Sequence, residues 1–367
     1  MNLLAVCFIG FFVTLVAVLG LRPLARTIDL VDRPGGRKAH HGNVPLVGGL
    51  AMFIGIVAGL GFIHPPVTAG ISLVGVSAIL VAIGLLDDRF ELSHWMRLCV
   101  HLVAAIALIG GTGALVRHLG NPFGLGEIRL HGIAVYMFTV LLIAAAINAF
   151  NMLDGMDGLA GVTALTAFLG LAIVGWLEGH RGEELAICAV AAAAVCGFLI
   201  FNVPFRYVGR LRCFMGDAGS TLLGAVVVWL GIRTSQNPMA SPMNPVTVLW
   251  ILALPVFELF WTVIRRVSRG RSPMMADQEH FHHLLLGGGF SVRAAFISFA
   301  LINLFFAATG IVLDVLDVPD VVSLTLLVLA GVLMVRAMYQ AHRAVQWMPA
   351  LRRERRDDRT RYGDLAR

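Results

Sequence analysis

Long apolar stretches constrain the fold of this chain more than any other feature of its sequence. About eleven of them approach the roughly 20 residues that a helix needs to cross a bilayer. A soluble globular domain carries about 25% charged residues, whereas this chain of 367 residues carries 14% and has a mean hydropathy of +0.84. The sequence therefore predicts an all-α polytopic integral membrane protein. The predicted spans lie at about 3–21, 44–63, 69–86, 96–114, 131–147, 159–177, 184–202, 218–232, 246–264, 294–313 and 321–339, of which 218–232 is the weakest because it is short and contains glycine.

Basic residues indicate the orientation of the predicted spans. Most of the lysine and arginine residues between spans lie in the loops at about 22–43, 87–97, 148–158, 203–217 and 265–293. The alternate loops hold only Arg117, Arg129, Arg181 and Arg233. Because basic loops stay on the cytoplasmic side of a membrane, we expect the first set to be cytoplasmic. The N-terminus is then periplasmic and, with an odd number of spans, the C-terminus is cytoplasmic.

We interpret residues 1–340 as a single membrane-embedded domain and residues 341–367 as a basic cytoplasmic tail. The tail reads LRRERRDDRTR from Leu351 to Arg361, a composition that is attracted to anionic lipid headgroups. The isoelectric point near 9.5 does not indicate a nucleic acid partner, because the basic residues lie in loops between spans and in this tail.

The most polar stretch between two spans reads NAFNMLDGMDGLAG from Asn148 to Gly161. An aspartate at mid-bilayer costs about 2.5–3.5 kcal/mol on translocon-type scales, so acids near lipid are functional candidates. Asp154 and Asp157 are three residues apart, and in helical geometry they would share a face. The same holds for Asn148 and Asn151. A polar turn between helices is the alternative, but such turns rarely carry this much oxygen at this depth.

Two adjacent acids, Asp87 and Asp88, end the third apolar stretch in the sequence LLDDR. Adjacent carboxylates repel each other, so either a cation neutralises them or at least one has a raised pKa. Carboxylates suit Mg²⁺, which takes oxygen ligands, and one of the acids could instead act as a general base. Acids at a helix C-terminus oppose the helix dipole, which disfavours charges that merely point into water.

A third motif, FMGDAGST, places Asp217 at the expected start of a helix with glycines close on both sides. The start of a helix favours phosphate, because exposed N–H groups can meet the negative charge. A simple N-cap would select the same residue type. The motif alone leaves both interpretations open.

The first predicted cytoplasmic loop, at residues 29–49, is basic and contains glycine and proline. Arg37, Lys38, His40 and His41 would suit a phosphate ligand. A loop that obeys the positive-inside rule would have a similar composition, so this loop taken alone does not decide between the two.

The long loop at 265–293 contains three histidines, His280, His282 and His283. No HExxH motif, cysteine pair or other metal-type spacing accompanies them, which disfavours zinc. Four arginines precede them in the same loop: Arg265, Arg266, Arg269 and Arg271. A pocket rich in hydrogen-bond donors for pyrophosphate or sugar hydroxyls fits this composition better.

Together, LLDDR after a span, NxxNxxDGxDGLAG, FMGDAGST and HxHH resemble the polyprenyl-phosphate N-acetylhexosamine-1-phosphate transferase family. Their order and spacing cover the chain from about Asp29 to His283, and the predicted span plan matches the family too. Within the family, the chain is most similar to the bacterial undecaprenyl-phosphate α-N-acetylglucosaminyl 1-phosphate transferases. The peptidoglycan branch carries three consecutive histidines where this chain reads HFHH.

The resemblance implies a Mg²⁺-dependent reaction in the bacterial cytoplasmic (inner) membrane, with Mn²⁺ as a possible substitute. UDP-GlcNAc and undecaprenyl phosphate would give undecaprenyl-diphospho-GlcNAc and UMP on the cytoplasmic face, as the first membrane step of a surface polysaccharide of O-antigen, common antigen or teichoic acid type. Another UDP-N-acetylhexosamine could replace the donor. A homodimer is also expected from the family.

The resemblance also implies roles for individual residues. Asp217 would be the main Mg²⁺ ligand, with Asn151 as a second. Asp87 would deprotonate or orient the lipid phosphate, with Asp88 in support. The residues expected to bind nucleotide, sugar or phosphate are Asp154, Asp157, Asn148, Arg97, Lys38, Arg266, Asp277, His280, His282 and His283.

Two mechanisms fit these roles. The lipid phosphate could attack directly, or an aspartate could first form a covalent phospho-sugar intermediate. Direct attack is favoured, because a phosphate with a second pKa of about 6 is largely ionised at cytosolic pH.

Three other protein classes fit less well. A membrane prenyltransferase would need two DxxxD-like motifs, and a CDP-alcohol phosphotransferase would need Ala-Arg shortly after the DG. A secondary transporter would place its polar residues at mid-membrane rather than at the cytoplasmic ends of spans.

Overall fold

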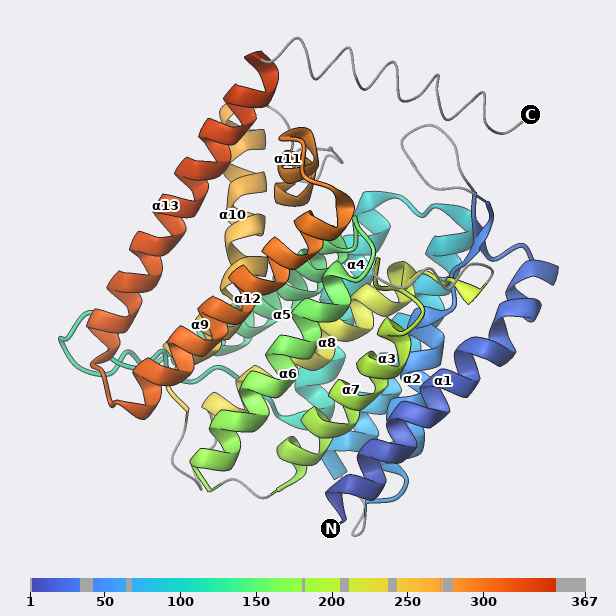
Figure 1. The fold of residues 1–367 in the computed structure, drawn as a ribbon. Helices are drawn as coiled ribbons and strands as arrows, with labels where there is room; N and C mark the ends of the chain where they lie inside the picture. The colour runs from blue at the N-terminus through green and yellow to red at the C-terminus, as the bar shows by residue number, and fades with distance from the viewer. Residues whose placement is uncertain are drawn as a thin grey trace.

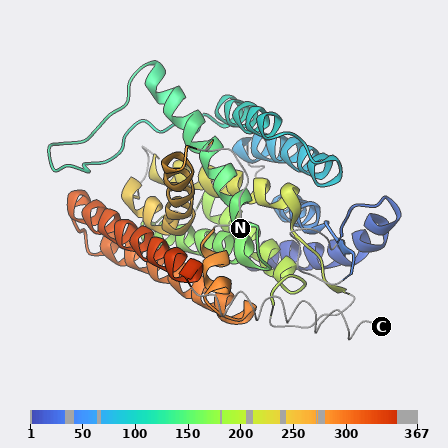
Figure 2. The ribbon, with the colours of Figure 1, turned by 90° about the horizontal axis from the view of Figure 1, so that it is seen from above.

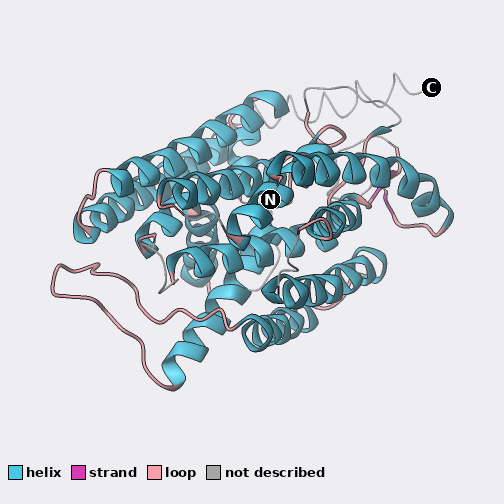
Figure 3. Ribbon diagram, turned by 90° about the horizontal axis from the view of Figure 1, so that it is seen from below, coloured by secondary structure: helices cyan, strands magenta, loops and turns pink. Residues whose placement is uncertain are grey.

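The computed structural model describes residues 2–33, 42–63, 68–179, 182–204, 211–236, 243–270, 272 and 280–347. The helices are α1 (Leu3–Thr27), α2 (Gly48–Leu60), α3 (Thr68–Phe90), α4 (His94–Thr112), α5 (Ile133–Leu153), α6 (Leu159–Leu177), α7 (Glu183–Leu199), α8 (Gly216–Ser235), α9 (Pro245–Ile251), α10 (Ala253–Ser268), α11 (Phe281–Gly287), α12 (Val292–Val315) and α13 (Asp320–Trp347). Two short strands, β1 (Val31–Asp32) and β2 (Val44–Pro45), pair antiparallel with Val31 opposite Pro45. The prediction of an all-α fold is confirmed, and Figure 3 shows how little of the chain is strand.

All of the predicted apolar stretches fold into helices, but they differ in length. Within the described residues, eight helices are long and apolar enough to cross a membrane, or nine if α9 and α10 form one broken span. Two other helices are shorter, since α2 has 13 residues and α7 has 17. A polytopic membrane protein is therefore shown, and the count of eleven spans stays a prediction.

A sharp bend separates α9 from α10, whose axes differ by 76°. Pro255 lies in the first turn of α10 and has no backbone N–H. A continuous helix would need that N–H to bond the carbonyl of Ile251, which is the last residue of α9. The break turns α10 toward the end of the molecule that also holds α11 (Figure 1).

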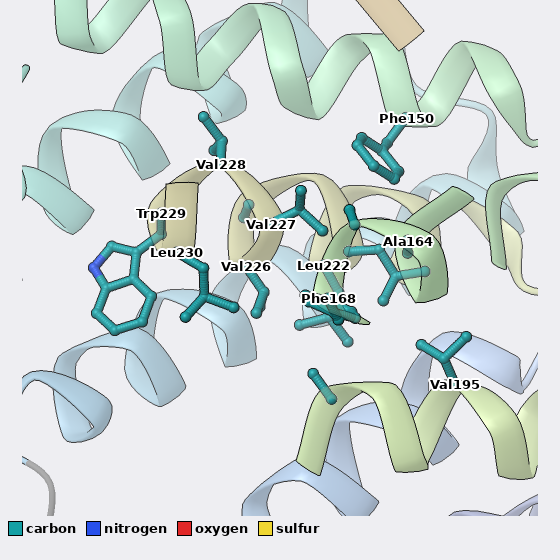
Figure 4. Close-up of a cluster of buried hydrophobic side chains, with 14 of the residues drawn as sticks. Phe150, Ala164, Phe168, Val195, Leu222, Val226, Val227, Val228, Trp229 and Leu230 are labelled. Atoms are coloured by element: carbon teal, nitrogen blue, oxygen red, sulfur yellow. The ribbon is translucent and has the colours of Figure 1, made fainter. Parts of the chain in front are cut away.

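Helix α8, which corresponds to the weakest predicted span, lies at the centre of the molecule. Every residue of α8 except Asp217 and Arg233 is buried. Figure 4 shows its side chains packed among residues of the neighbouring helices, including Phe150 and Phe168. A helix that is buried all round needs neighbours on every side, and α8 has them in α2, α3, α5 and α6.

Two glycines bring α2 and α3 unusually close to the start of α8. A Cβ atom on Gly49 would lie 2.2 Å from the backbone nitrogen of Gly219. A Cβ on Gly84 would lie 2.4 Å from the Cα of Ala218. Small residues allow helix backbones to approach in this way, and both contacts lie next to Asp217.

The helices run between two ends of the molecule. In Figure 1, α1 begins at the lower end, whereas α11 lies at the upper end and α13 finishes there. The loop at residues 113–132 extends sideways from the bundle (Figure 2), and its Asn121 N–H donates to Asp320 Oδ2 at 2.7 Å. Residues 341–347 of the predicted tail 341–367 belong to α13, and the rest of that tail lies outside the described residues.

Candidate active site

The end of α3 and the start of α8 are joined through Asp88. Its Oδ1 accepts a hydrogen bond from the Asp217 N–H at 2.8 Å, and its Oδ2 lies 3.5 Å from the Ala218 nitrogen. A carboxylate in this position satisfies free N–H groups of the helix start and complements its dipole. Asp88 therefore caps α8 from another helix. The simple N-cap interpretation of Asp217 is wrong, because the N-cap residue is Met215.

Gly216 makes this capping contact possible. Its φ is +73°, a conformation that favours glycine. A Cβ atom there would also lie 2.4 Å from Asp88 Oδ2. Glycine at this position therefore permits both the turn into α8 and the approach of the Asp88 carboxylate.

The Asp217 side chain is held between two other helices. Its Oδ1 accepts a hydrogen bond from Asn151 Nδ2 at 2.6 Å, and Arg97 Nη1 lies 3.5 Å from its Oδ2. Asn151 Nδ2 also donates to Ser220 Oγ at 3.1 Å. The Asp217 side chain is 27% exposed. The structure thus brings together the two residues expected to bind metal.

Asp87 is buried near the C-terminal end of α3 and contacts the next helix. Its Oδ2 forms an ion pair with Arg97 Nε at 2.7 Å, and its Oδ1 accepts from the Leu92 N–H at 2.8 Å. The short turn between α3 and α4 is fixed by Ser93, whose Oγ accepts from the Met96 N–H. Since only 6% of Asp87 is exposed, the alternative of acids that merely point into water is wrong for this residue.

We call Asp87, Asp88, Asp217, Asn151 and Arg97 the acid cluster. A cavity opens beside it between α3, α4 and α8. The cavity is lined by Leu80, Ile83, Gly84, Asp87, Leu92, Arg97, Val100, His101, Asp217 and Thr221. The lining of the cavity therefore contains both charged and aliphatic side chains.

The stretch from Asp154 to Gly158 is a turn between α5 and α6. Asp154 and Asp157 therefore do not share a helical face, and that expectation is wrong because the chain leaves the helix after Leu153. Gly158 has a φ of +77°, which ends the turn and begins α6. Asn148 and Asn151 do lie on one helix, but the Asn148 amide contacts Met152 Sδ at 3.3 Å.

Asp154 caps the C-terminal end of α5 near the acid cluster. Burial raises the pKa of Asp154 to about 8, and the negative charges of Asp217 and Asp157 add to the increase. A carboxyl in this environment holds its proton near neutral pH unless a cation approaches.

Asp157 is bound by Arg212, which sequence analysis missed. The two side chains form an ion pair, and the Arg212 guanidinium also lies 5.0 Å from the centre of the Phe214 ring. Asn202 was missed as well. Its Oδ1 accepts from the Gly158 N–H at 2.7 Å and its Nδ2 donates to the Cys213 carbonyl at 2.9 Å.

Asn202 and Arg212 both lie in the segment before the FMGD motif. One is polar and the other is basic, and the helix α8 starts shortly after them. That placement was the only signal in the sequence that could have indicated them. Together they hold the 154–158 turn against the segment that leads into α8.

The histidine segment, residues 280–283, lies where α11 begins. His282 is 1% exposed, and neither of its ring nitrogens has a hydrogen-bond partner among the described residues. Burial lowers the pKa of the His282 imidazole, as do positive charges on His283 and His280. A Cβ atom on Gly155 would lie 2.6 Å from His282 Nε2. The histidine segment therefore contacts the turn that carries Asp154.

A buried carboxylate that sequence analysis missed holds the histidine segment in place. Glu258 on α10 is 1% exposed, and its Oε1 accepts from the Phe281 N–H at 2.8 Å. The same oxygen lies 3.1 Å from His280 Nδ1. Arg266 on α10 is also buried. Lys38 and Asp277 lie outside the described residues.

The acid cluster offers few ligands of its own to a metal ion. Within the described ranges, no group of three or more His, Cys, Asp or Glu side chains is placed to hold a metal. Mg²⁺ usually takes one or two carboxylates and completes its shell with water and substrate phosphates. The Asp217 carboxylate and the Asn151 amide supply oxygen donors of this kind. The donor set therefore fits a magnesium ion that is shared with a phosphate ligand.

Comparison with known proteins gives a consistent result over most of the chain. The profile of the family described as Glycosyl transferase family 4 matches residues 70–235. An Escherichia coli protein named undecaprenyl-phosphate alpha-N-acetylglucosaminyl 1-phosphate transferase is 34% identical over 351 residues, which cover 95% of this chain and 94% of that protein. Proteins of the same name from Salmonella typhi and Haemophilus influenzae are 35% and 33% identical, over 97% and 95% of this chain and 96% of each relative.

Proposed function

The chain belongs to glycosyl transferase family 4, among the undecaprenyl-phosphate alpha-N-acetylglucosaminyl 1-phosphate transferases, and from this premise we propose that it transfers GlcNAc-1-phosphate from UDP-GlcNAc to undecaprenyl phosphate. The observation that carries the proposal is the contact of Asp217 with Asn151 and Arg97 beside a cavity that is partly charged and partly aliphatic. A reaction between two phosphate-bearing substrates needs cationic and oxygen-ligand groups together.

In the proposed reaction, an oxygen of the lipid phosphate attacks the phosphorus that carries GlcNAc. The bond from that phosphorus to the bridging oxygen breaks, and this oxygen leaves with UMP. The Arg97 guanidinium reaches the cavity from α4 and would bind a phosphate through charge-assisted hydrogen bonds. Mg²⁺ held by Asp217 and Asn151 would supply Lewis-acid stabilisation of the phosphoryl charge.

The contacts of Asp87 and Asp88 support a positioning role for both. Asp87 uses one oxygen for Arg97 and the other for the Leu92 N–H, so it orients the guanidinium that faces the phosphate. Asp88 uses its carboxylate to fix the start of α8. A nucleophilic aspartate needs a free oxygen, so these contacts favour direct attack by the lipid phosphate over a covalent intermediate.

The donor nucleotide would lie on the side of the 154–158 turn and the histidine segment. Asp154, Asp157 and the neighbouring Arg212 supply acceptors and a donor, which suits a uridine and its phosphate. The histidine segment with Arg266 would hold pyrophosphate and sugar. Lys38 and Asp277 are expected to contribute from outside the described residues.

We place the active site on the cytoplasmic face of the bacterial inner membrane, on the basis of the basic loops. The product lipid would then serve as the first membrane intermediate of a surface polysaccharide of O-antigen, common antigen or teichoic acid type. A homodimer is proposed from the family alone. Another UDP-N-acetylhexosamine is the second candidate donor.

The test is UMP release by the full-length protein in detergent. We expect UMP only when UDP-GlcNAc, undecaprenyl phosphate and Mg²⁺ are all present, with the lipid product detected by mass spectrometry. Faster release from UDP-GalNAc than from UDP-GlcNAc would make the second donor the correct one. A stoichiometric burst of UMP from lipid-free enzyme would refute direct attack, and no release under any condition would refute the proposed function.

A further inference from the structure

His101 is a buried histidine on α4 to which no role has been assigned above. It is 5% exposed and begins a stripe of buried residues that continues with Ala104, Ala105, Leu108 and Ile109. This spacing places one face of α4 against the bundle. Val103, which is 64% exposed, lies on the other face.

The His101 side chain lies on the face of α4 that borders the acid cluster. It follows Arg97 by four residues, so the two side chains lie one above the other on the same face of α4. Both line the cavity that also holds Asp87 and Asp217. His101 lies deeper than Arg97 along the helix, away from the turn that joins α4 to α3.

The His101 imidazole lines the cavity, and its nitrogens are not among the fully enclosed polar atoms without a partner in the described part of the chain. A polar side chain inside an apolar helix is costly to place near lipid and is a functional candidate. Its position in the cavity wall leaves the imidazole accessible to a ligand in the cavity.

The remaining lining of the cavity limits the chemistry of that ligand. The lining combines the aliphatic side chains of Leu80, Ile83 and Val100 with charged groups that include Arg97. UDP-GlcNAc is polar along its whole length and would bury these aliphatic side chains poorly. A polyprenyl phosphate carries an anionic head directly attached to a hydrocarbon chain, which matches both kinds of side chain in the lining.

We propose that His101 is a binding residue for the acceptor lipid: together with Arg97 it holds the phosphate of the polyprenyl phosphate, while Leu80, Ile83 and Val100 pack against its first isoprene unit. The proposal deepens the proposed function and rests on it. The neutral imidazole donates one N–H to a non-bridging phosphate oxygen. The oxygen that attacks UDP-GlcNAc stays free, and the head group is fixed beside Asp217.

The test compares two variants that differ in hydrogen bonding. His101→Leu removes the donor and keeps an aliphatic side chain, and His101→Gln keeps an N–H donor. The KM values for undecaprenyl phosphate and for UDP-GlcNAc are measured separately by UMP release. Loss of one hydrogen bond to a charged group corresponds to about a tenfold or greater loss of binding.

We therefore expect His101→Leu to raise the KM for undecaprenyl phosphate at least about tenfold and to leave the KM for UDP-GlcNAc within about twofold. His101→Gln should recover most of the loss. Val103→Leu, on the opposite face of the same helix, is the matched control and should behave as wild type. An unchanged lipid KM in His101→Leu, or an equal rise in both KM values, would overturn the proposal.

A binding measurement without turnover separates this proposal from the proposed function. Farnesyl phosphate has the same phosphate head group attached to a shorter isoprenoid chain, and its effect on the Tm of each variant is measured without UDP-GlcNAc. It should stabilise wild type and His101→Gln but not His101→Leu. Equal stabilisation of all three proteins would refute the role of His101 even if the enzyme were active. Absence of turnover in wild type with this pattern intact would refute only the proposed reaction.

Discussion

Two polar regions of the molecule differ in how fully their side chains are paired. In the acid cluster, Asp87, Asp88 and Asp217 each contact N–H, amide or guanidinium groups of the chain itself. Arg97 Nε makes no hydrogen bond among the described residues but lies 2.7 Å from Asp87 Oδ2, so its charge is paired. In the histidine segment, both ring nitrogens of His282 lack partners among the described residues, and so does Glu258 Oε2.

The difference indicates where each region obtains its stability. A paired cluster is already ordered before substrate arrives, which is the condition for electrostatic preorganisation. An unpaired buried group lowers the stability of the ligand-free protein, and it gains a hydrogen-bond partner only when a ligand binds. We expect the acid cluster to be part of the folding core and the histidine segment to be satisfied by substrate.

The largest expected effect is on the acid cluster. Asp217→Asn keeps the shape of the side chain but removes the charge that would bind Mg²⁺, so turnover should fall by about a thousandfold or more. Yield and elution from size-exclusion chromatography should match wild type. A near-normal rate at limiting Mg²⁺ would show that Asp217 is not the metal ligand.

A second variant tests whether the acid cluster depends on its backbone. Gly216→Ala places a Cβ where φ is +73° and where Asp88 Oδ2 would be 2.4 Å away. We expect a loss of about 1–3 kcal/mol in stability and a fall in kcat of at least about tenfold, because Asp88 must move. Gly75→Ala is the control, since a Cβ there has no neighbour within 4 Å. Equal effects of both substitutions would show that the Asp88 contact is unimportant.

A third variant addresses the histidine segment. His282→Leu removes two unsatisfied buried nitrogens, so the Tm should rise by a few degrees, in line with about 1 kcal/mol. Activity should fall strongly at the same time. Asp88→Asn is the contrasting variant and should lower the Tm. A drop in Tm for His282→Leu would mean that the histidine is satisfied in the free protein.

The smallest effect is a pH dependence that involves Asp154. Its pKa of about 8 in the folded protein exceeds the unfolded value of about 3.9, so the folded state binds the additional proton. Stability contributed by this group is therefore lost as pH rises from about 4 to about 8. In metal-free buffer, Asp154→Asn should become more stable than wild type over that interval. Parallel Tm curves for the two proteins would contradict the expectation.

The sequence was sufficient to predict the helical class and most of the acid cluster. Apolar length predicts helices in a bilayer, because every backbone group must be bonded within the segment. It does not predict the shape of each segment, because the short α2 and the broken α9–α10 pair are shaped by packing and by Pro255 rather than by hydropathy. The motif of Asp217 was visible, whereas its cap by Asp88 depends on a contact between distant helices.

Other parts of the candidate site could not be predicted for a related reason. Glu258 and Asn202 act through hydrogen bonds to backbone groups of remote segments. In the sequence they appear as single polar residues in apolar surroundings, without a motif. The expected shared face of Asp154 and Asp157 failed because α5 ends at Leu153, before either acid, and spacing alone does not reveal where a helix ends.

The enclosure of α8 has a consequence for biogenesis. Among the described helices that are able to cross a membrane, α8 is the least apolar. The mean hydropathy of its most apolar 18 residues is 1.2, compared with 1.6 to 2.8 for the others. Such a segment partitions weakly into lipid by itself. The stability of α8 in the membrane must therefore depend on α3 and α5. These helices are synthesised before α8 and provide a protein surface against which it packs. We expect the helix that carries Asp217 to be retained only after these neighbours have assembled, so that this acid is not exposed to lipid during synthesis.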